Sequence, residues 1–285
     1  MVKAVIGTGI IGTKIAEILL KADGELIVFN RTKEKAGYLK SLGACVVPSV
    51  EAAVNGADCI ILTLADKKGI DDSLFFDQLN LKGKLVLQMG TISPEESIEI
   101  SGHVKHAGGD YLECPILGSR REIEQKCLIM MVGGDQLLYK KWGAFFSLFG
   151  QDHYYIGKVG QAAALKLAIN QIIASHAVGF SLSLGMVEKN NIDINMFMDI
   201  LKKSSLYATM FEKKMANWSE RKYSDPNFST KHLLKDVGLI VEHAKTLGLR
   251  ADIVQCIGRI LQESVEEGLG DSDYSAVFNT INRIE

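Results

Sequence analysis

The sequence predicts two successive folding units: an α/β domain with a parallel, doubly wound sheet, and an all-helical domain after it. The first half alternates short apolar runs with amphipathic segments, whereas from Gly160 onward the apolar spacing is helical almost to the end. Alternating strands and helices imply a parallel sheet with helices on both faces. The 285 residues, 47% of them hydrophobic, are enough for two ordinary domains. We therefore expect domains over 1–159 and 160–285.

The strands of the first domain are expected to be short and apolar, because helices cover both faces of such a sheet. Helical patterns over 12–21 and 94–107 separate some of them, and a helix over about 136–148 lies between the last two. The expected strands are 3–6, 25–29, 59–62, 84–88, 110–113, 128–132 and 153–156.

The second domain begins with one long apolar helix over 161–188, which is expected to join the two domains. Three more helices are expected over 195–203, 231–247 and 253–267. Helices this apolar need partners, so a homodimer or homotetramer is expected.

Composition narrows the class of partner. The formal net charge is −2 and no basic block is present, so no nucleic-acid partner is expected. The five cysteines are scattered without a C-x-x-C pair, which indicates free thiols in a reducing cytoplasm and no metal site. No basic and apolar leader opens the chain, and no apolar run reaches the roughly 18 residues of a membrane span, so no membrane partner is expected.

A glycine motif, GTGIIG, follows the first expected strand and opens the first helix. This context makes it a dinucleotide-binding fingerprint of the Rossmann type. The first glycine allows the tight turn, the second lets the backbone approach the pyrophosphate, and the third lets the helix pack on the strand. The helix N-terminus points free N–H groups at the phosphates. The cofactor-binding residues expected here are Gly7, Thr8, Gly9, Ile10, Ile11 and Gly12.

The end of the second strand indicates which dinucleotide is bound. NAD-specific sites usually place a carboxylate there to hold the ribose diol, but this chain has Asn30, Arg31 and Thr32. The planar fork of an arginine suits the 2′-phosphate of NADP. We therefore expect NADP(H) to be preferred over NAD(H), with all three residues at the cofactor and Lys33 beside them.

Five motifs carry a family resemblance along nearly the whole chain: GTGIIG, FNRT, GTISPEES, GKVGQAAALKLAIN and KHLLKD, in that order. In these the chain resembles the β-hydroxyacid dehydrogenases, which include 3-hydroxyisobutyrate dehydrogenases and are related to 6-phosphogluconate dehydrogenase. The glyoxylate and succinic semialdehyde reductase branch is the most similar. The resemblance implies an NADPH-dependent reductase of small aldehyde or oxo acids.

The resemblance makes Lys166 the catalytic lysine and Asn170 its partner. Four residues apart on one helix, both side chains lie on the same face. The surrounding segment is apolar, and burying a lysine there is costly unless it serves a purpose. A lysine ammonium, with its three donors, is suited to polarising a carbonyl oxygen and giving it a proton. A snorkelling lysine at the domain edge is the alternative.

The remaining site residues also follow from the resemblance. Thr91 and Lys235 match residues at the cofactor, and Leu64 and Ala65, just after the strand at 59–62, are expected to contact it too. The residues expected at the substrate are Gly118, Ser119, Phe228 and Asp236.

Two departures from the family pattern bear on the substrate. Gly90 replaces a serine before the threonine, and Leu117 replaces the serine that would donate to a substrate carboxylate. Carboxylate binding then shifts to Ser119 and backbone N–H groups, with Arg120 and Arg121 nearby, or the substrate is less polar at that end. The alternatives that stay open are an NADP-dependent 3-hydroxy acid dehydrogenase, an imine reductase-like enzyme and an inactive NADP-binding interaction module.

Overall fold

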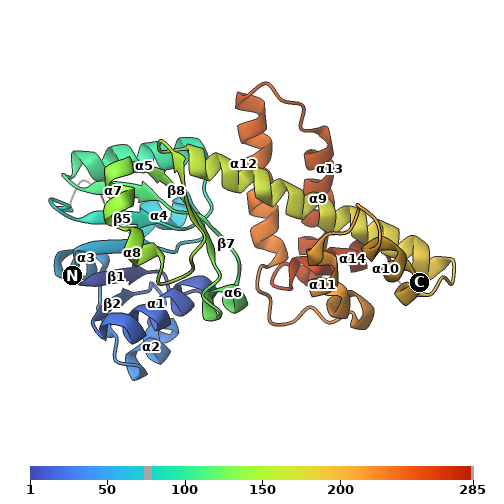
Figure 1. The fold of residues 1–285 in the computed structure, drawn as a ribbon, viewed down its shortest axis with the longest axis horizontal. Coiled ribbons are helices and arrows are strands. Elements are labelled where there is room, and N and C mark those ends of the chain that lie inside the picture. Colours follow the sequence, from blue (N-terminus) through green and yellow to red (C-terminus); the bar gives the residue numbers. More distant parts are fainter. Residues whose placement is uncertain (74–78, 284–285) are drawn as a thin grey trace. The chain divides into compact units, whose positions relative to one another are not determined.

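The computed structural model describes residues 1–73 and 79–283, which divide into two compact units, Met1–Leu167 and Ala168–Glu285 (Figure 1). The division falls inside one continuous helix, α9 (Gln161–Lys189). The expected boundary at 159/160 lies just before this helix. The two units are described separately below.

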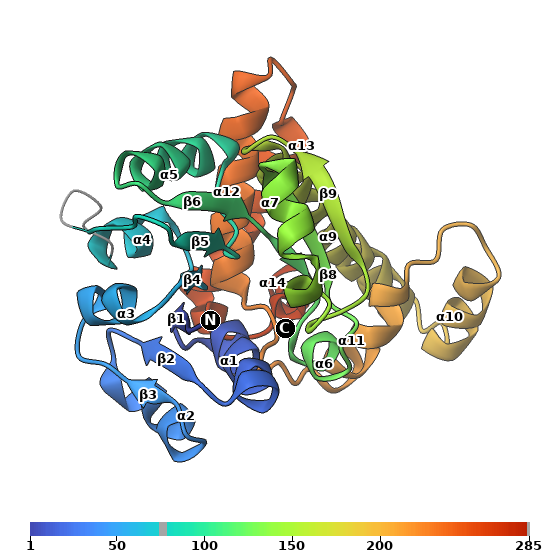
Figure 2. The ribbon, with the colours of Figure 1, turned by 60° about the vertical axis from the view of Figure 1, so that its left-hand side comes forward.

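Among its described residues, the first unit is built on a nine-stranded sheet of order β3-β2-β1-β4-β5-β6-β8-β7, with β9 paired to β8. Figure 2 shows the strands from β3 to β6 following one another in this order. These six strands are parallel. From β1 the chain adds β2 and β3 on one side and then β4, β5 and β6 on the other, which confirms the doubly wound class. The strands are β1 (Lys3–Ile6), β2 (Leu26–Phe29), β3 (Cys45–Val46), β4 (Cys59–Leu62), β5 (Leu85–Gln88), β6 (Asp110–Glu113), β7 (Ile116–Leu117), β8 (Ile129–Gly134) and β9 (His153–Gly157).

The sheet is not parallel throughout, because β8 runs antiparallel to both β6 and β7. The register with β8 continues from β6 to β7, so these two strands lie in line along β8 with Pro115, which has no N–H to donate, between them. The chain then returns through a short connection that carries one small helix, and antiparallel strands need no longer crossover. The parallel, doubly wound sheet that the sequence predicts is therefore extended at this edge by the antiparallel strand β8.

Side chains of the parallel strands alternate between two cores. Val5, Ile61 and Leu87 pack into one apolar cluster, and Ile60 and Val86 into another. This period of two places helices on both faces of the sheet. The helices of the unit are α1 (Ile10–Asp23), α2 (Gly37–Ser41), α3 (Val50–Gly56), α4 (Lys67–Ser73), α5 (Pro94–His106), α6 (Arg120–Glu124), α7 (Gln136–Lys141) and α8 (Gly143–Phe146), with a 3-10 turn over Lys33–Ala36.

Local signals explain where several helices begin and end. At α5, Ser93 and Glu96 form a capping box and Pro94 takes the first turn, where its missing N–H costs nothing. The single helix expected over 136–148 is instead the pair α7 and α8, separated at Trp142, whose backbone (φ −96°, ψ 6°) leaves the helical region.

The second unit is all-helical, as expected. The three helices expected after α9 begin and end within a few residues of the expected bounds. Two others were missed: α11, whose sequence is largely polar and buries only Phe211 and Trp218, and the five-residue α14. The helices are α10 (Ile194–Lys202), α11 (Thr209–Glu220), α12 (Thr230–Thr246), α13 (Asp252–Ser264) and α14 (Val277–Ile281), with short turns over Val265–Leu269 and Tyr274–Ala276.

An aromatic cluster forms the core of this unit. Phe180 of α9 lies with its ring centroid 4.3 Å from Phe211 and 4.7 Å from Trp218. The Trp218 indole N–H donates to the Ser275 carbonyl at 3.1 Å, so its one polar group is satisfied in the core.

The last described turn is fastened to α9 by Asn282. Its amide donates to the Ser181 carbonyl at 2.9 Å, and its side-chain oxygen fills the space beside Gly185, where an added Cβ would lie only 1.5 Å from it. Glycine is therefore required at position 185 while asparagine occupies position 282.

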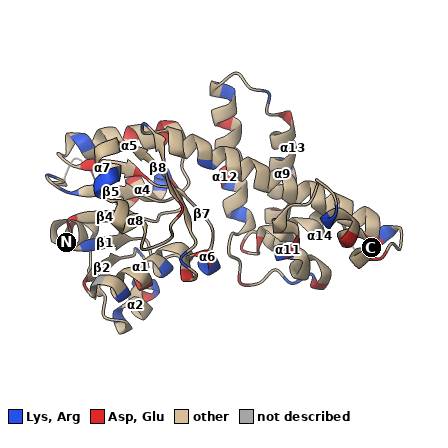
Figure 3. Ribbon diagram, viewed as in Figure 1, with Lys and Arg blue, Asp and Glu red and all other residues tan. Residues whose placement is uncertain are grey.

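Figure 3 shows basic and acidic residues interspersed along both units.

By length and composition alone, α9 meets the criteria for a membrane-spanning helix, with a mean hydropathy of 1.4 over 18 residues. The expectation that no apolar run reaches the length of a membrane span was therefore wrong. One helix of this kind is weak evidence for a membrane, since core helices of water-soluble proteins pass the same test.

Candidate active site

The turn between β1 and α1 has the geometry of a dinucleotide-binding loop. Gly7 has a φ of +97°, which side-chain-bearing residues rarely adopt. A Cβ on Gly12 would lie 2.0 Å from the Gly7 carbonyl oxygen, so only glycine lets the helix pack this closely. Gly9 has an ordinary φ of −72°, and a Cβ there would meet no atom of the described residues within 4 Å. The glycine that approaches a pyrophosphate therefore borders open space.

Polar groups in this loop fit a dinucleotide. The Thr8 N–H donates to the Asn30 side-chain oxygen at 2.9 Å, and the Asn30 amide donates to the Thr32 carbonyl at 2.8 Å. Asn30 thus ties the loop to the end of β2. The Thr8 hydroxyl is buried without a hydrogen-bond partner among the described residues, and Gly9 offers α1 no side-chain cap. An orphaned hydroxyl and an uncapped helix N-terminus are groups that phosphate oxygens satisfy.

Arg31 stands beside this loop with an 82% exposed side chain. Its guanidinium lies 3.9 Å from the Asp72 carboxylate, a long and solvent-screened ion pair that leaves its donors available. Thr32 is exposed as well and precedes the 3-10 turn. A guanidinium placed after β2 suits a 2′-phosphate.

The turns after β1, β4 and β5 meet at the carboxyl edge of the sheet. A Cβ on Gly7 would touch Leu64, and a Cβ on Gly90 would lie 2.4 Å from the Leu64 carbonyl oxygen. The departure at position 90 therefore has a steric reason, because a serine does not fit here. Leu64 and Thr91 are half-buried and Ala65 is exposed, all at this edge, where ligands of doubly wound sheets bind.

Sequence reasoning missed the role of Gln88 at this edge. Its side chain accepts from the Gly90 N–H at 3.3 Å and donates to the Gly90 carbonyl at 3.4 Å. It is 1% exposed and holds the backbone that carries Thr91. An amide ending an otherwise apolar strand was the available signal.

The expected substrate loop follows β7. Gly118 has a φ of +137°, and half-buried Leu117 pairs with Ile129 in the sheet. The Ser119 hydroxyl donates to the Glu122 carboxylate at 2.6 Å and its N–H donates to the same oxygen at 2.8 Å. Both donors of Ser119 therefore serve the start of α6, which argues against a shift of carboxylate binding to this residue.

Lys166 lies in the second turn of α9 and is only 8% exposed. Ala162, Ala163 and Leu167 around it are buried and apolar. Asn170 follows one turn later on the same helix and is 2% exposed. Their catalytic roles stay predictions. A lysine this deeply buried is uncommon unless it is paired or has a function.

Within the helical unit, α9 and α12 bring three of the expected residues together. The Asn170 amide donates to the Asp236 carboxylate at 2.6 Å, and the other oxygen of Asp236 lies 2.7 Å from the Lys235 ammonium. Asp236 is 1% exposed, and the Lys235 ammonium compensates the charge of its buried carboxylate. The Asn170 side-chain oxygen is buried without a hydrogen-bond partner among the described residues. Asp236 thus orients the amide so that an acceptor stays available.

Phe228 stands just before α12, with its ring centroid 5.8 Å from that of Tyr274.

A histidine lies in the first turn of α12. The Ser229 hydroxyl lies 2.9 Å from Nδ1 of His232. Burial, together with the charges of Lys231 and Lys235, lowers the pKa of His232 below its usual range. This shift favours the neutral form of the imidazole.

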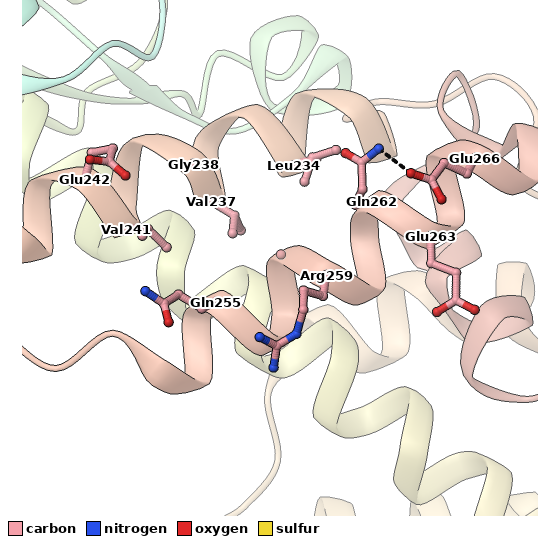
Figure 4. A pocket seen from close by; sticks show the side chains of 11 residues that line it. Leu234, Val237, Gly238, Val241, Glu242, Gln255, Arg259, Gln262, Glu263 and Glu266 are labelled. Atoms are coloured by element: carbon pink, nitrogen blue, oxygen red, sulfur yellow. Dashed lines mark hydrogen bonds between the residues drawn. The ribbon is translucent and has the colours of Figure 1, made fainter.

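The helical unit also has a groove between two of its helices. It runs between α12 and α13, with Gly238 and Gly258 on its walls (Figure 4). None of the expected site residues lines it. The lining side chains are Leu234, Val237, Val241, Glu242, Gln255, Arg259, Gln262, Glu263 and Glu266.

Comparisons with known proteins agree with this arrangement. Residues 3–157 match the family model for the NAD-binding domain of 6-phosphogluconate dehydrogenase, and residues 160–281 match the NAD-binding domain of NADP-dependent 3-hydroxyisobutyrate dehydrogenase. Over 283 residues the chain is 30% identical to glyoxylate/succinic semialdehyde reductase 2 of Arabidopsis thaliana, covering 97% of this chain and 78% of the relative.

Two further matches, one in sequence and one in fold, add to this comparison. The chain is 27% identical to the cytokine-like nuclear factor N-PAC of Drosophila melanogaster, covering 96% of this chain but only 46% of that protein. The fold is similar to that of a Mycobacterium tuberculosis 3-hydroxyisobutyrate dehydrogenase, with a TM-score of 0.88, 20% identity and 99% of both chains covered. With its dinucleotide loop and its two matched domains, the chain belongs to the family of NAD(P)-dependent β-hydroxyacid dehydrogenases that includes 6-phosphogluconate and 3-hydroxyisobutyrate dehydrogenases.

Proposed function

We propose that the protein reduces small aldehyde or oxo acids, of the glyoxylate or succinic semialdehyde type, to hydroxy acids with NADPH. The nicotinamide supplies the hydride when it is bound. Lys166 polarises the substrate carbonyl and gives its oxygen a proton, and Asn170 accepts a hydrogen bond through its side-chain oxygen. Asp236 holds the Asn170 amide in that orientation.

The observation that carries this proposal is the burial of Lys166 and Asn170 one turn apart on α9. Lys166 is 8% exposed, and Asn170, which is 2% exposed, keeps a buried side-chain oxygen without a hydrogen-bond partner among the described residues. A donor that binds beside this oxygen would satisfy it. The relatedness to plant glyoxylate/succinic semialdehyde reductases over nearly the whole chain supports the substrate class.

The test is NADPH oxidation by the purified protein with glyoxylate and with succinic semialdehyde, followed at saturating cofactor. We expect turnover of at least one of them. A protein that binds NADPH but turns over neither would instead support a second candidate, a cofactor-binding module without catalysis. Leu117 and the engagement of Ser119 by Glu122 favour that candidate, since both remove donors for a substrate carboxylate.

A preference for NADPH over NADH is part of the proposal and depends on Arg31. Changing Arg31 to alanine is expected to weaken NADPH binding by about 10- to 100-fold, the usual value of a charge-assisted hydrogen bond, and to leave NADH binding unchanged. Fluorescence titration with both cofactors measures this. An equal loss for NADPH and NADH would contradict a contact with the 2′-phosphate.

We also propose that the protein is a homo-oligomer. Large apolar side chains recur along one face of α9 and stay half-exposed: Ile172 at 51%, Leu182 at 50% and Met186 at 59%. An apolar helix face of this length usually meets a partner. Sedimentation velocity is expected to give a dimer or larger species, and an Ile172→Glu, Leu182→Glu variant a smaller one. A monomeric parent protein would refute the proposal.

A further inference from the structure

Glu113, the last residue of β6, is a buried carboxylate to which the proposed chemistry assigns no role. It is 1% exposed. One of its oxygens accepts from the backbone N–H groups of Ala162, at 2.7 Å, and of Ala163, at 3.3 Å. These groups open α9, so the carboxylate joins the end of a central strand to the start of the helix that carries Lys166.

The contact completes the hydrogen bonding of the first turn of α9. The Gln161 N–H donates to the Lys158 carbonyl, and the first bond of the regular helical pattern runs from the Ala164 N–H to the Gly160 carbonyl. Between them, the N–H groups of Ala162 and Ala163 have no intrahelical acceptor, and the Glu113 carboxylate accepts from both. A negative charge at this end also interacts favourably with the helix dipole.

A buried relay holds the other oxygen of Glu113. It accepts from the hydroxyl of Ser97 on α5, and that hydroxyl lies 2.9 Å from the hydroxyl of Tyr111. Because the one proton of Ser97 goes to Glu113, Tyr111 donates to Ser97. Burial raises the pKa of Tyr111, which keeps this donor protonated. The carboxylate is therefore fixed from two sides.

The sheet makes room for this side chain. Gly133 of β8 stands opposite Glu113 in the register, and a Cβ there would lie 2.4 Å from the carboxylate oxygen. Any larger residue at position 133 would displace the carboxylate from α9. The strand pair is thus shaped around the contact.

Lys166 lies one helical turn beyond Ala162. Side chains of a helix lean toward its N-terminus, so the lysine lies back over the turn that Glu113 holds. We propose that Glu113 is a positioning residue. It holds the first turn of α9 in place against the end of β6 and supplies a negative charge at the start of the helix that carries Lys166. This inference rests on the proposed function of Lys166.

The test compares Glu113→Gln with the parent. The amide keeps the size of the side chain but loses the charge, and it can donate where the carboxylate accepted. We expect kcat to fall by about 10- to 100-fold, the order of effect that a small misplacement of a catalytic group has. NADPH affinity is expected to stay within about two-fold, because the hydrogen bonds of the Glu113 side chain go to Ser97, Ala162 and Ala163 and not to the dinucleotide loop.

A pH profile separates positioning from a merely structural role. A carboxylate favours the charged form of a nearby ammonium, so its loss is expected to move the basic limb of the kcat profile to lower pH. Asp135→Ala is the matched control, since Asp135 caps α7 in the same unit by accepting from the Leu138 N–H at 2.8 Å. That variant is expected to lose some stability and to keep both kcat and its pH profile.

Peptide-level hydrogen exchange supplies a readout without turnover. Glu113→Gln is expected to lose protection over the first turn of α9 and to keep it in β1 and β4. Unchanged exchange, kcat and pH profile in this variant would overturn the positioning role. A parent protein that reduces neither aldehyde would instead refute the proposed function, so the two failures are distinct.

Discussion

Replacing Lys166 by alanine is expected to lower kcat for aldehyde reduction by about 10²- to 10⁴-fold, the usual contribution of a positioned acid. NADPH affinity is expected to stay unchanged, because the change leaves the dinucleotide loop and Arg31 intact. Stopped-flow and steady-state rates measure kcat, and NADPH titration measures the affinity.

Lys166→Arg is the sharper companion to this change. It keeps the positive charge, but a guanidinium does not give up its proton at ordinary pH and its planar fork fits a different geometry. We expect it to lose nearly as much kcat as alanine. If Lys166→Arg keeps most of the activity, Lys166 acts through its charge alone and is not the proton donor.

The second large effect is expected in the dinucleotide loop, where Gly9 and Gly12 have different roles. Gly9→Ala puts a methyl group into open space at an ordinary φ, so the free protein is expected to keep its stability. NADPH affinity is expected to fall by about 10²-fold, because that space is where the backbone approaches the pyrophosphate.

Gly12→Ala is expected to reduce both the stability of the free protein and its affinity for NADPH. Its methyl group would lie 2.0 Å from a backbone carbonyl, so α1 must move away from β1. Overpacking of this kind costs about 1–3 kcal/mol, and here the neighbour is rigid backbone. Gly102→Ala on α5, where a Cβ meets no described atom within 4 Å, is the control. Urea unfolding and NADPH fluorescence check all three; a Gly9→Ala variant that binds NADPH normally would contradict the assignment of the loop.

The sequence was most informative where local pattern and tertiary packing agree. The apolar runs of β1, β4 and β5 are covered on both faces, so their residues predict strands without knowledge of their neighbours. The antiparallel strand β8 was not predictable in direction, because direction follows from how the chain returns after β7 and not from side chains. Helix α11 was missed since it buries too few residues to show a period.

The candidate site divides in the same way. The glycines at positions 7 and 12 were predictable because the tight turn and the close packing of α1 demand that residue type. The role of Arg31 stays a prediction from its charge. The reason for Gly90 was not, because its steric limit comes from the Leu64 carbonyl, far away in sequence. Nor was the use of Ser119, whose donors are taken by Glu122 through the local geometry of α6. Contacts between strand ends and side-chain orientations become visible only in three dimensions.

The fastening of Asn282 beside Gly185 has a consequence for how this family diverges. The two positions share one volume, so neither can change freely: a methyl group at 185 is tolerated only after the residue at 282 has become smaller. Lineages that keep the asparagine are expected to keep the glycine, nearly a hundred residues earlier. A paired substitution at these two sites, more than any change at either alone, marks an evolutionary route by which the end of the helical unit is rebuilt.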